Sequence, residues 1–259
     1  MGYYGMFMSL AMVVGPFVGL TIIQHSPFRS LFLLCIACSI LGLFTAVAVK
    51  HAHTTNIKDE NARFAWNKLI EPRAIPIFIT GFTLALAYSG ISAFASVYGQ
   101  NLGLFHITNY FFAVFALLVV MPRPILGHLF DSRGENTVMY PAIGFFLVGI
   151  SLLSQVRGGF GFLASAALIG LGYGVLFPGL QALSVASIAG HRRGFAMSTF
   201  LLFFDAGTGF GSIILGLIAG QSGFQTMYIV CAVIVVAMAA LYYLLHHRSK
   251  ISYSNGVQV

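Results

Sequence analysis

Asp205 is the residue that most clearly combines a reactive group with an unusual position. It lies inside an apolar run, roughly residues 196–220, that contains no other charged residue. If this run crosses a bilayer as a helix, the carboxylate lies about nine residues from one end, or roughly 14 Å deep at 1.5 Å per residue. An ionised Asp at the bilayer centre costs about 2.5–3.5 kcal/mol, and loss of water favours its protonated form. We therefore expect Asp205 to couple protons, with a structural hydrogen bond to a neighbouring helix as the alternative.

Further polar residues within the apolar runs are spaced to share helix faces. Ser198, Thr208 and Ser212 fall on one face together with the carboxylate, because side chains three and four residues apart lie one above the other. We expect this face to meet water or another helix rather than lipid. The other candidate cavity-lining residues are Tyr88, Ser89, Ser92, Ser96, Gln100, Tyr173 and Gln181. Packing, or hydrogen bonding between helices, is the alternative for each of them.

The elements that position these residues must lie in lipid. Of the 259 residues, 58% are hydrophobic and only 7% are charged, whereas a soluble domain has about 25% charged residues. A soluble chain of this size would have too little polar surface to face water. The formal charge of +7 comes from basic residues in short breaks between apolar runs. It therefore indicates membrane topology and not nucleic-acid binding.

Eight apolar runs are long enough to be transmembrane helices, which need about 20 apolar residues. The sequence therefore predicts an all-α membrane protein with eight transmembrane helices. The predicted helices are roughly residues 3–23, 28–49, 76–99, 105–122, 137–156, 160–182, 196–220 and 224–247.

The basic residues in the breaks between these runs predict how the chain is oriented. Eleven Lys and Arg residues lie on one side of the predicted membrane, and only Arg29 and Arg157 lie on the other. Because Lys and Arg are enriched in cytoplasmic loops, the first side is predicted to be cytoplasmic, with both termini there. We expect a multi-pass protein of the cell membrane that contacts the lipid bilayer.

A long polar break and an internal repeat divide the chain. Shifting the sequence by 196 positions aligns residues 1–51 with residues 197–247 without a gap and with eight identities. The repeat indicates two related halves, of which the first is incomplete. The predicted units are 1–49, the last two helices of an N-terminal half; 50–75, a cytoplasmic linker; 76–250, a six-helix C-terminal half; and 251–259, a cytoplasmic tail.

The first run contains Gly15-Pro16, followed by Gly19. Glycines open a smooth helix face and Pro removes one backbone hydrogen bond, so helices packed there can slide or tilt. The motif resembles the antiporter motif in the fifth helix of the major facilitator superfamily, with Leu20 where a second Gly is usual. Ordinary packing of small residues is the alternative.

The break before residue 137 resembles the C-terminal copy of a loop signature of the same superfamily. In that superfamily the loop forms a charge network that holds one conformation closed. Here Asp131 has Arg123 and Arg133 as candidate partners, while Ser132 replaces a usual base, which implies a weaker lock. A polar turn is the alternative. The matching residues are Gly127, Leu129, Asp131 and Gly134.

The sixth run carries glycine at every second position, in Gly170, Gly172 and Gly174, followed by Pro178. It is similar to the tenth helix of the superfamily, and a helix weakened in this way suits a gate. The resemblance covers the whole chain, from the fifth family helix to the twelfth. It implies a major facilitator fold that lacks its first four helices, which would belong to the same transporter.

The resemblance implies a secondary active transporter that exports small molecules with proton coupling. An importer of sugars or other metabolites with the same fold is one alternative, and an inactive fragment or membrane interaction protein is another. The sequence lacks HExxH, GxSxG and phosphate-loop motifs. Its three Cys lie in apolar runs without metal-ligand spacing. We therefore expect no enzymatic activity, cofactor or bound metal.

Overall fold

The computed structural model describes residues 11, 14–15, 18–19, 21–23, 26–48, 75–121, 132, 134–186, 188 and 193–255. Its helices are α2 (Phe28–Ala48), α4 (Ile75–Asn101), α5 (Phe105–Val120), α7 (Glu135–Ser154), α8 (Gly159–Ala186) and α9 (Arg193–Asn255). The described part of the chain contains no strand, so the all-α prediction is confirmed. The predicted linker, 50–75, lies outside the described residues except at its last position.

The helices follow the predicted runs closely. A backbone in lipid must satisfy its own hydrogen bonds, so each apolar run long enough to cross the membrane forms a helix. α9 spans two predicted runs and is broken at Gly223, where φ is 82° and ψ is 165°. Glycine adopts this positive φ without the steric cost that a side chain brings. The first predicted run, 3–23, is described only at separate helical positions, so the total of eight helices stays a prediction.

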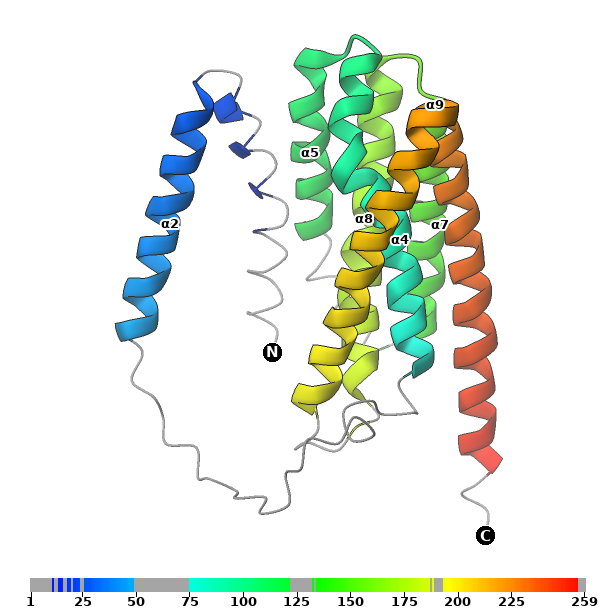
Figure 1. The fold of residues 1–259 in the computed structure, drawn as a ribbon. Coiled ribbons are helices and arrows are strands. Elements are labelled where there is room, and N and C mark those ends of the chain that lie inside the picture. The colour runs from blue at the N-terminus through cyan, green and yellow to red at the C-terminus, as the bar shows by residue number, and fades with distance from the viewer. Residues whose placement is uncertain are drawn as a thin grey trace.

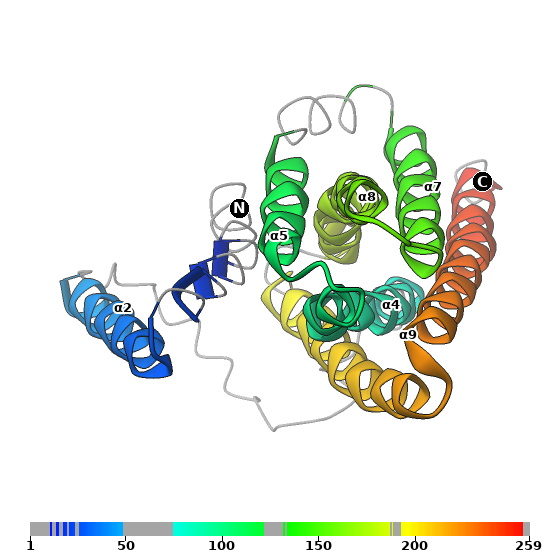
Figure 2. The ribbon, with the colours of Figure 1, turned by 90° about the horizontal axis from the view of Figure 1, so that it is seen from above.

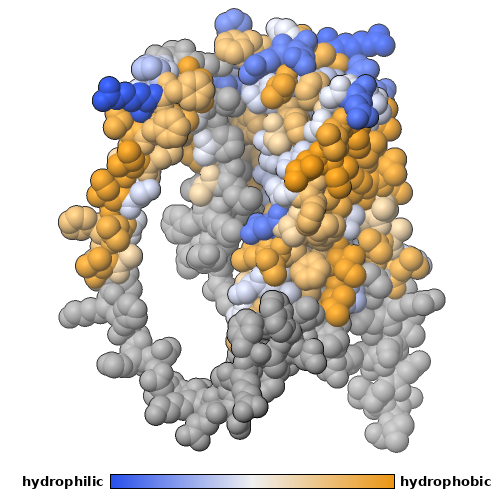
Figure 3. Space-filling model, in the orientation of Figure 1, coloured by the Kyte–Doolittle hydropathy of each residue, from blue (hydrophilic) through white to orange (hydrophobic). Residues whose placement is uncertain are grey.

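Five of the described helices are long and apolar enough to cross a membrane: α2, α4, α7, α8 and α9. α5 is equally apolar but shorter, with 16 residues. The outer surface suits a lipid solvent, since Phe44 on α2 is 75% exposed and Leu217 on α9 is 62% exposed. Figure 3 shows apolar side chains over most of the described surface, with hydrophilic ones gathered at one end of the bundle.

The helices from α4 onward form one bundle, with α8 at its centre. Viewed from above, α5 and α7 flank α8 on two sides, and α4 separates α8 from the first part of α9 (Figure 2). α2 stands apart from this bundle (Figure 1), and no residue in its apolar membrane-spanning stretch is buried. The helices α4, α5, α7, α8 and α9 therefore pack against one another, and the predicted division of the chain into two halves stays a prediction.

Glycines bring α8 into backbone contact with both of its flanking helices. A Cβ added to Gly170 would lie 2.7 Å from the carbonyl oxygen of Phe115 on α5. A Cβ added to Gly172 would lie 2.6 Å from the backbone nitrogen of Phe146 on α7. Real Cβ atoms do not come this close, so glycine is required at both positions. The alternating glycines therefore serve two opposite faces of α8, which remains a continuous helix through Pro178.

A second glycine contact joins α9 to α4. A Cβ on Gly207 would lie 2.5 Å from the carbonyl oxygen of Phe82. One turn further along, a Cβ on Gly211 would meet the hydroxyl of Ser89 and lie 3.0 Å from the Cα of Leu86. Small residues at such interfaces let membrane helices approach closely, and van der Waals packing then holds them together. α4 and the first half of α9 are thus tightly joined.

Candidate functional site

Tyr88 and Tyr173, both predicted to line a cavity, meet face to face in the middle of the bundle. Their ring centroids are 4.2 Å apart with an interplanar angle of 12°, and the residues are only 7% and 4% exposed. Phe177 stacks on Tyr173 at 5.8 Å, and Phe204 meets Phe177 at 4.8 Å. Phe115 lies 5.8 Å from Tyr173. Four helices, α4, α5, α8 and α9, therefore converge on one buried aromatic cluster.

The predicted polar residues of α4 fall into two groups. Ser89 is fully buried at the contact with α9, and its hydroxyl donates to the carbonyl oxygen of Leu86 at 2.7 Å. Ser92 and Gln100 are exposed, and Ser96 is half-buried. Of these four residues of α4, only Ser89 is thus buried in the contact with α9. On α8, Gln181 is buried and sits about 12 Å along the helix from Tyr173.

The first half of α9 has three distinct faces, since successive residues are turned by about 100°. The core face carries Phe200, Phe204, Gly207, Gly211 and Leu215, all buried. An apolar outer face carries Leu202, Phe210, Ile213 and Leu217, which are 60–67% exposed. The third face carries Ser198, Asp205, Thr208, Gly209, Ser212 and Gly216, which are exposed or half-buried. The polar face therefore adjoins the apolar face that suits lipid.

Asp205 is exposed on this polar face, and no other described residue bonds to it. The hydroxyls beside it are already committed to their own helix. Ser198 donates to the Gly194 carbonyl at 3.0 Å, Thr208 to Phe204 at 3.1 Å, and Ser212 to Gly209 at 2.8 Å. A hydroxyl has one hydrogen to give, so these three groups provide no donor for the carboxylate.

Basic side chains are also distant from Asp205 along α9. Arg193, at the start of the helix, lies twelve residues away in sequence, or roughly 18 Å along the axis. Its Nε donates to the carbonyl oxygen of Ile188 at 3.3 Å. Between Arg193 and His246 the sequence has no Lys, Arg or His. A donor for Asp205 must therefore come from outside this helix.

The predicted gating residues are only partly described. Pro16, Arg123, Gly127, Asp131 and Arg133 lie outside the described residues, so the structure does not test their roles. Gly15 and Gly19 are described: no atom of the described residues lies within 4 Å of a Cβ added to Gly15, and a Cβ added to Gly19 would lie 3.9 Å from Leu31. Gly134 has φ 83° and caps α7. Asn136, just inside α7, accepts a hydrogen bond from the Tyr242 hydroxyl at 3.0 Å.

Two buried polar features were not predicted from the sequence. Asn109 is 8% exposed within α5. The sequence indicates it only as an amide side chain inside an apolar run. The Tyr228 hydroxyl donates to the Gly90 carbonyl at 3.2 Å and joins α9 to α4. No local pattern indicates that second contact, because its residues are 138 positions apart.

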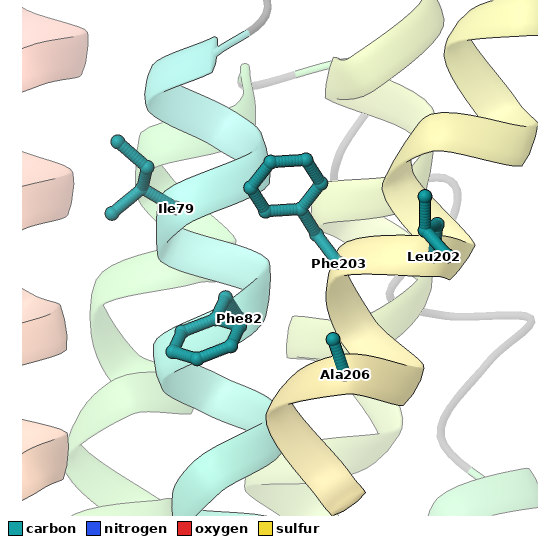
Figure 4. Close-up of a pocket in the computed structure, with 5 residues that line it drawn as sticks. All are labelled: Ile79, Phe82, Leu202, Phe203 and Ala206. Carbon is teal, nitrogen blue, oxygen red and sulfur yellow. The ribbon is translucent and has the colours of Figure 1, made fainter. Parts of the chain in front are cut away.

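A groove of about 330 Å³ lies between α4 and the first half of α9. Figure 4 shows its lining, Ile79 and Phe82 from α4 and Leu202, Phe203 and Ala206 from α9. All five side chains are apolar, so the groove offers no polar group to orient a solute. It borders the apolar outer face of α9 and is separate from the polar face that carries Asp205.

Comparisons with known proteins assign the sequence to a family. The sequence model of the Major Facilitator Superfamily matches residues 1–159 and residues 138–258. The chain therefore belongs to the major facilitator superfamily and is a multi-pass membrane protein of a transporter family. The predicted resemblance is confirmed at this level, whereas its drug/proton antiporter character stays a prediction.

Its relatives include uncharacterized MFS-type transporters of prokaryotes. One, from Methanocaldococcus jannaschii, is 24% identical over 260 residues, which cover 94% of this chain and 65% of the relative. Another, from Burkholderia mallei strain SAVP1, is 25% identical over 240 residues, which cover 92% of this chain and 57% of the relative. A Burkholderia pseudomallei K96243 transporter gives the same figures. The chain thus spans 57–65% of the length of these relatives.

Proposed function

We propose that this chain is the C-terminal part of a secondary transporter that exports small molecules in exchange for protons, with Asp205 as the proton-carrying group. The four helices that precede the matched region in the family fold would complete the transporter. Both termini are proposed to lie in the cytoplasm. The single observation that carries the proposal is the exposed carboxylate of Asp205 on the polar face of α9.

The chemistry of that face favours a proton as the partner of Asp205. The neighbouring hydroxyls of Ser198, Thr208 and Ser212 donate to backbone carbonyls. An ionised carboxylate without donors is costly at this depth in a membrane. Binding a proton removes the charge, and water reaching the site from one side of the membrane allows its release. A group that alternates in this way couples proton movement to a conformational cycle.

The direction of transport rests on a different feature. Gly15 and Gly19 lie in a segment that resembles the antiporter motif of the superfamily, and export in exchange for protons is the activity that this resemblance supports. No atom of the described residues lies within 4 Å of a Cβ added to Gly15. Ser92, Ser96 and Gln100 on α4, with Tyr88, Tyr173 and Gln181 as their buried support, would form this half of the solute path.

Replacing Asp205 tests the proposal in the complete transporter, with the four preceding helices restored. Asp205→Asn keeps the shape and hydrogen-bonding capacity of the side chain but cannot titrate. We expect it to abolish solute flux driven by an imposed pH gradient, at unchanged expression and membrane insertion. Asp205→Glu is the matched control, since it retains a titrating carboxyl group and should retain part of the flux. Undiminished gradient-driven flux in Asp205→Asn would contradict the proton-carrying role.

A further inference from the structure

The apolar groove between α4 and the first half of α9 has no part in the proposed proton cycle. The two helices run in parallel and start at the same end of the bundle. Near that end a Cβ added to Gly81 would lie 2.7 Å from the ring of Phe200, and further along both helices Gly211 packs on Ser89. The groove therefore follows two helices whose backbones are held close together.

The hollow lies where the small side chain of Ala206 is surrounded by larger ones. Leu202 and Phe203 lie about one turn earlier on α9, and Ile79 and Phe82 face them from α4 (Figure 4). Leu202 is 67% exposed and Ile79 is 39% exposed, so the groove opens onto the outer surface of the bundle. An occupant must therefore come from the surroundings of the bundle, and it would touch only apolar side chains.

The size of the groove favours acyl chains over another helix. A helix with its side chains is about 10–12 Å across, and one turn rises 5.4 Å. One such turn fills more than the groove volume of about 330 Å³, so a neighbouring helix would insert only single side chains. Acyl chains are thin and wholly apolar, and they are the solvent that composition predicts for this surface.

The end of α9 nearest the groove is suited to bind an anion. α9 begins at Arg193 and has no acidic residue in its first turn, and a helix N-terminus carries a positive partial charge. Arg193 is exposed. Its guanidinium group has five N–H donors, of which Nε donates to the carbonyl oxygen of Ile188 at 3.3 Å. The other four have no acceptor among the described residues.

The distance between the charged end and the groove matches the length of a phospholipid. The α9 residues of the groove lie nine to thirteen positions beyond Arg193, or roughly 14–20 Å along the axis. One leaflet with its headgroups is about 20–22 Å thick, half of the whole bilayer. A lipid whose phosphate lies at Arg193 therefore has acyl chains long enough to reach Ala206.

We infer that the groove between α4 and α9 binds the acyl chains of an anionic phospholipid whose phosphate is held by Arg193 at the start of α9. Arg193 provides the preference for a negative headgroup, and the groove lined by Ile79, Phe82, Leu202, Phe203 and Ala206 provides the place for the chains. The inference goes beyond the proposed function, since it requires neither proton coupling nor solute transport.

Fluorescence quenching by brominated lipids tests this in the 259-residue chain. Trp66 is the single Trp of the chain, and Trp66→Phe gives a background without Trp. Leu202→Trp then places a fluorophore at the groove. Phe145→Trp is the matched control, because Phe145 is 45% exposed and lies ten residues into α7, a helix with the acidic Glu135 in its first turn. Each variant is reconstituted in bilayers that mix phosphatidylglycerol with phosphatidylcholine, with bromine on the acyl chains of one lipid or the other.

We expect the Trp at residue 202 to be quenched preferentially by brominated phosphatidylglycerol, by about fivefold in relative binding, the factor that one basic residue close to anionic lipid contributes. The Trp at residue 145 should show no preference. Arg193→Gln should abolish the preference at residue 202, and Arg193→Lys should retain it. Ala206→Phe fills the groove and should also abolish the preference, although Arg193 is intact.

Three results would overturn the inference. One is equal quenching by the two lipids at residue 202, and another is the same preference at residue 145. The third is a preference that survives Ala206→Phe, because the positive charge would then attract anionic lipid without the groove. Weak quenching by both lipids at residue 202 would likewise refute it, since protein from another copy of the chain would then cover the groove. None of these results bears on proton-driven flux in Asp205→Asn.

Discussion

At the scale of single residues, the glycines of α8 show how much of the packing depends on a missing methyl group. Gly172 faces the backbone of α7 so closely that a Cβ would lie within 2.7 Å of the Ala142 carbonyl oxygen. A Cβ added to Gly144, on α7, would have no atom of the described part of the chain within 4 Å. The two positions share a helical backbone and differ in their surroundings, so they form a matched pair for mutation.

We expect Gly172→Ala to destabilise the bundle by about 1–3 kcal/mol, the usual cost of overpacking. Gly144→Ala should be neutral or stabilising by up to about 1 kcal/mol, because Ala is the better helix former. Unfolding of the purified chain by a denaturing detergent measures both free energies. Equal effects of the two substitutions would show that the contact with α7 does not require glycine at residue 172.

At the scale of elements, helix positions could be predicted from the sequence, but helix partners could not. The run at 28–49 corresponds to α2, and the turn between the last two runs falls at Gly223. Apolar length alone determines such segments. The stacking of Tyr88 on Tyr173 joins α4 to α8 across the core. Nothing in the spacing of either residue indicates the other.

The polar face of α9 illustrates which part of the candidate site is visible in a sequence. The spacing of Ser198, Asp205 and Ser212 predicts a shared face, and the structure places them on one face. Their hydrogen bonds to backbone carbonyls could not be predicted, because a serine or threonine rotamer depends on its local neighbours. The roles of these residues in transport stay predictions.

At the scale of the whole molecule, the distribution of Lys and Arg predicts the topology. Single cysteines introduced at Asn61 and at Gly190 should react with a membrane-impermeant thiol reagent only from the cytoplasmic side. A cysteine at Asn101, at the end of α4, should react only from outside. Labelling is measured on intact cells and on inverted vesicles, in a background without Cys35 and Cys38. Reaction of the Asn61 variant from outside would reverse the predicted orientation.

A second whole-molecule prediction concerns the activity of the 259-residue chain alone. Alternating access requires one half of a transporter to rock against the other, and the sequence provides two predicted helices of the first half. We expect the purified chain in liposomes to give no more solute flux than empty liposomes. The complete transporter, reconstituted at the same density, is the positive control. Solute flux above that of empty liposomes would show that the 259-residue chain transports without any further helices.

The break at Gly223 also bears on how α9 enters the membrane during synthesis. A single glycine leaves no soluble loop between the two halves, so they must insert together as one helical hairpin. The second half, 224–244, contains nine Leu, Ile, Val and Phe residues, each favouring insertion by about 0.3–0.6 kcal/mol. Together they match the cost of about 2.5–3.5 kcal/mol that Asp205 imposes on the first half. The tight turn thus lets an apolar helix carry its acidic neighbour into the bilayer.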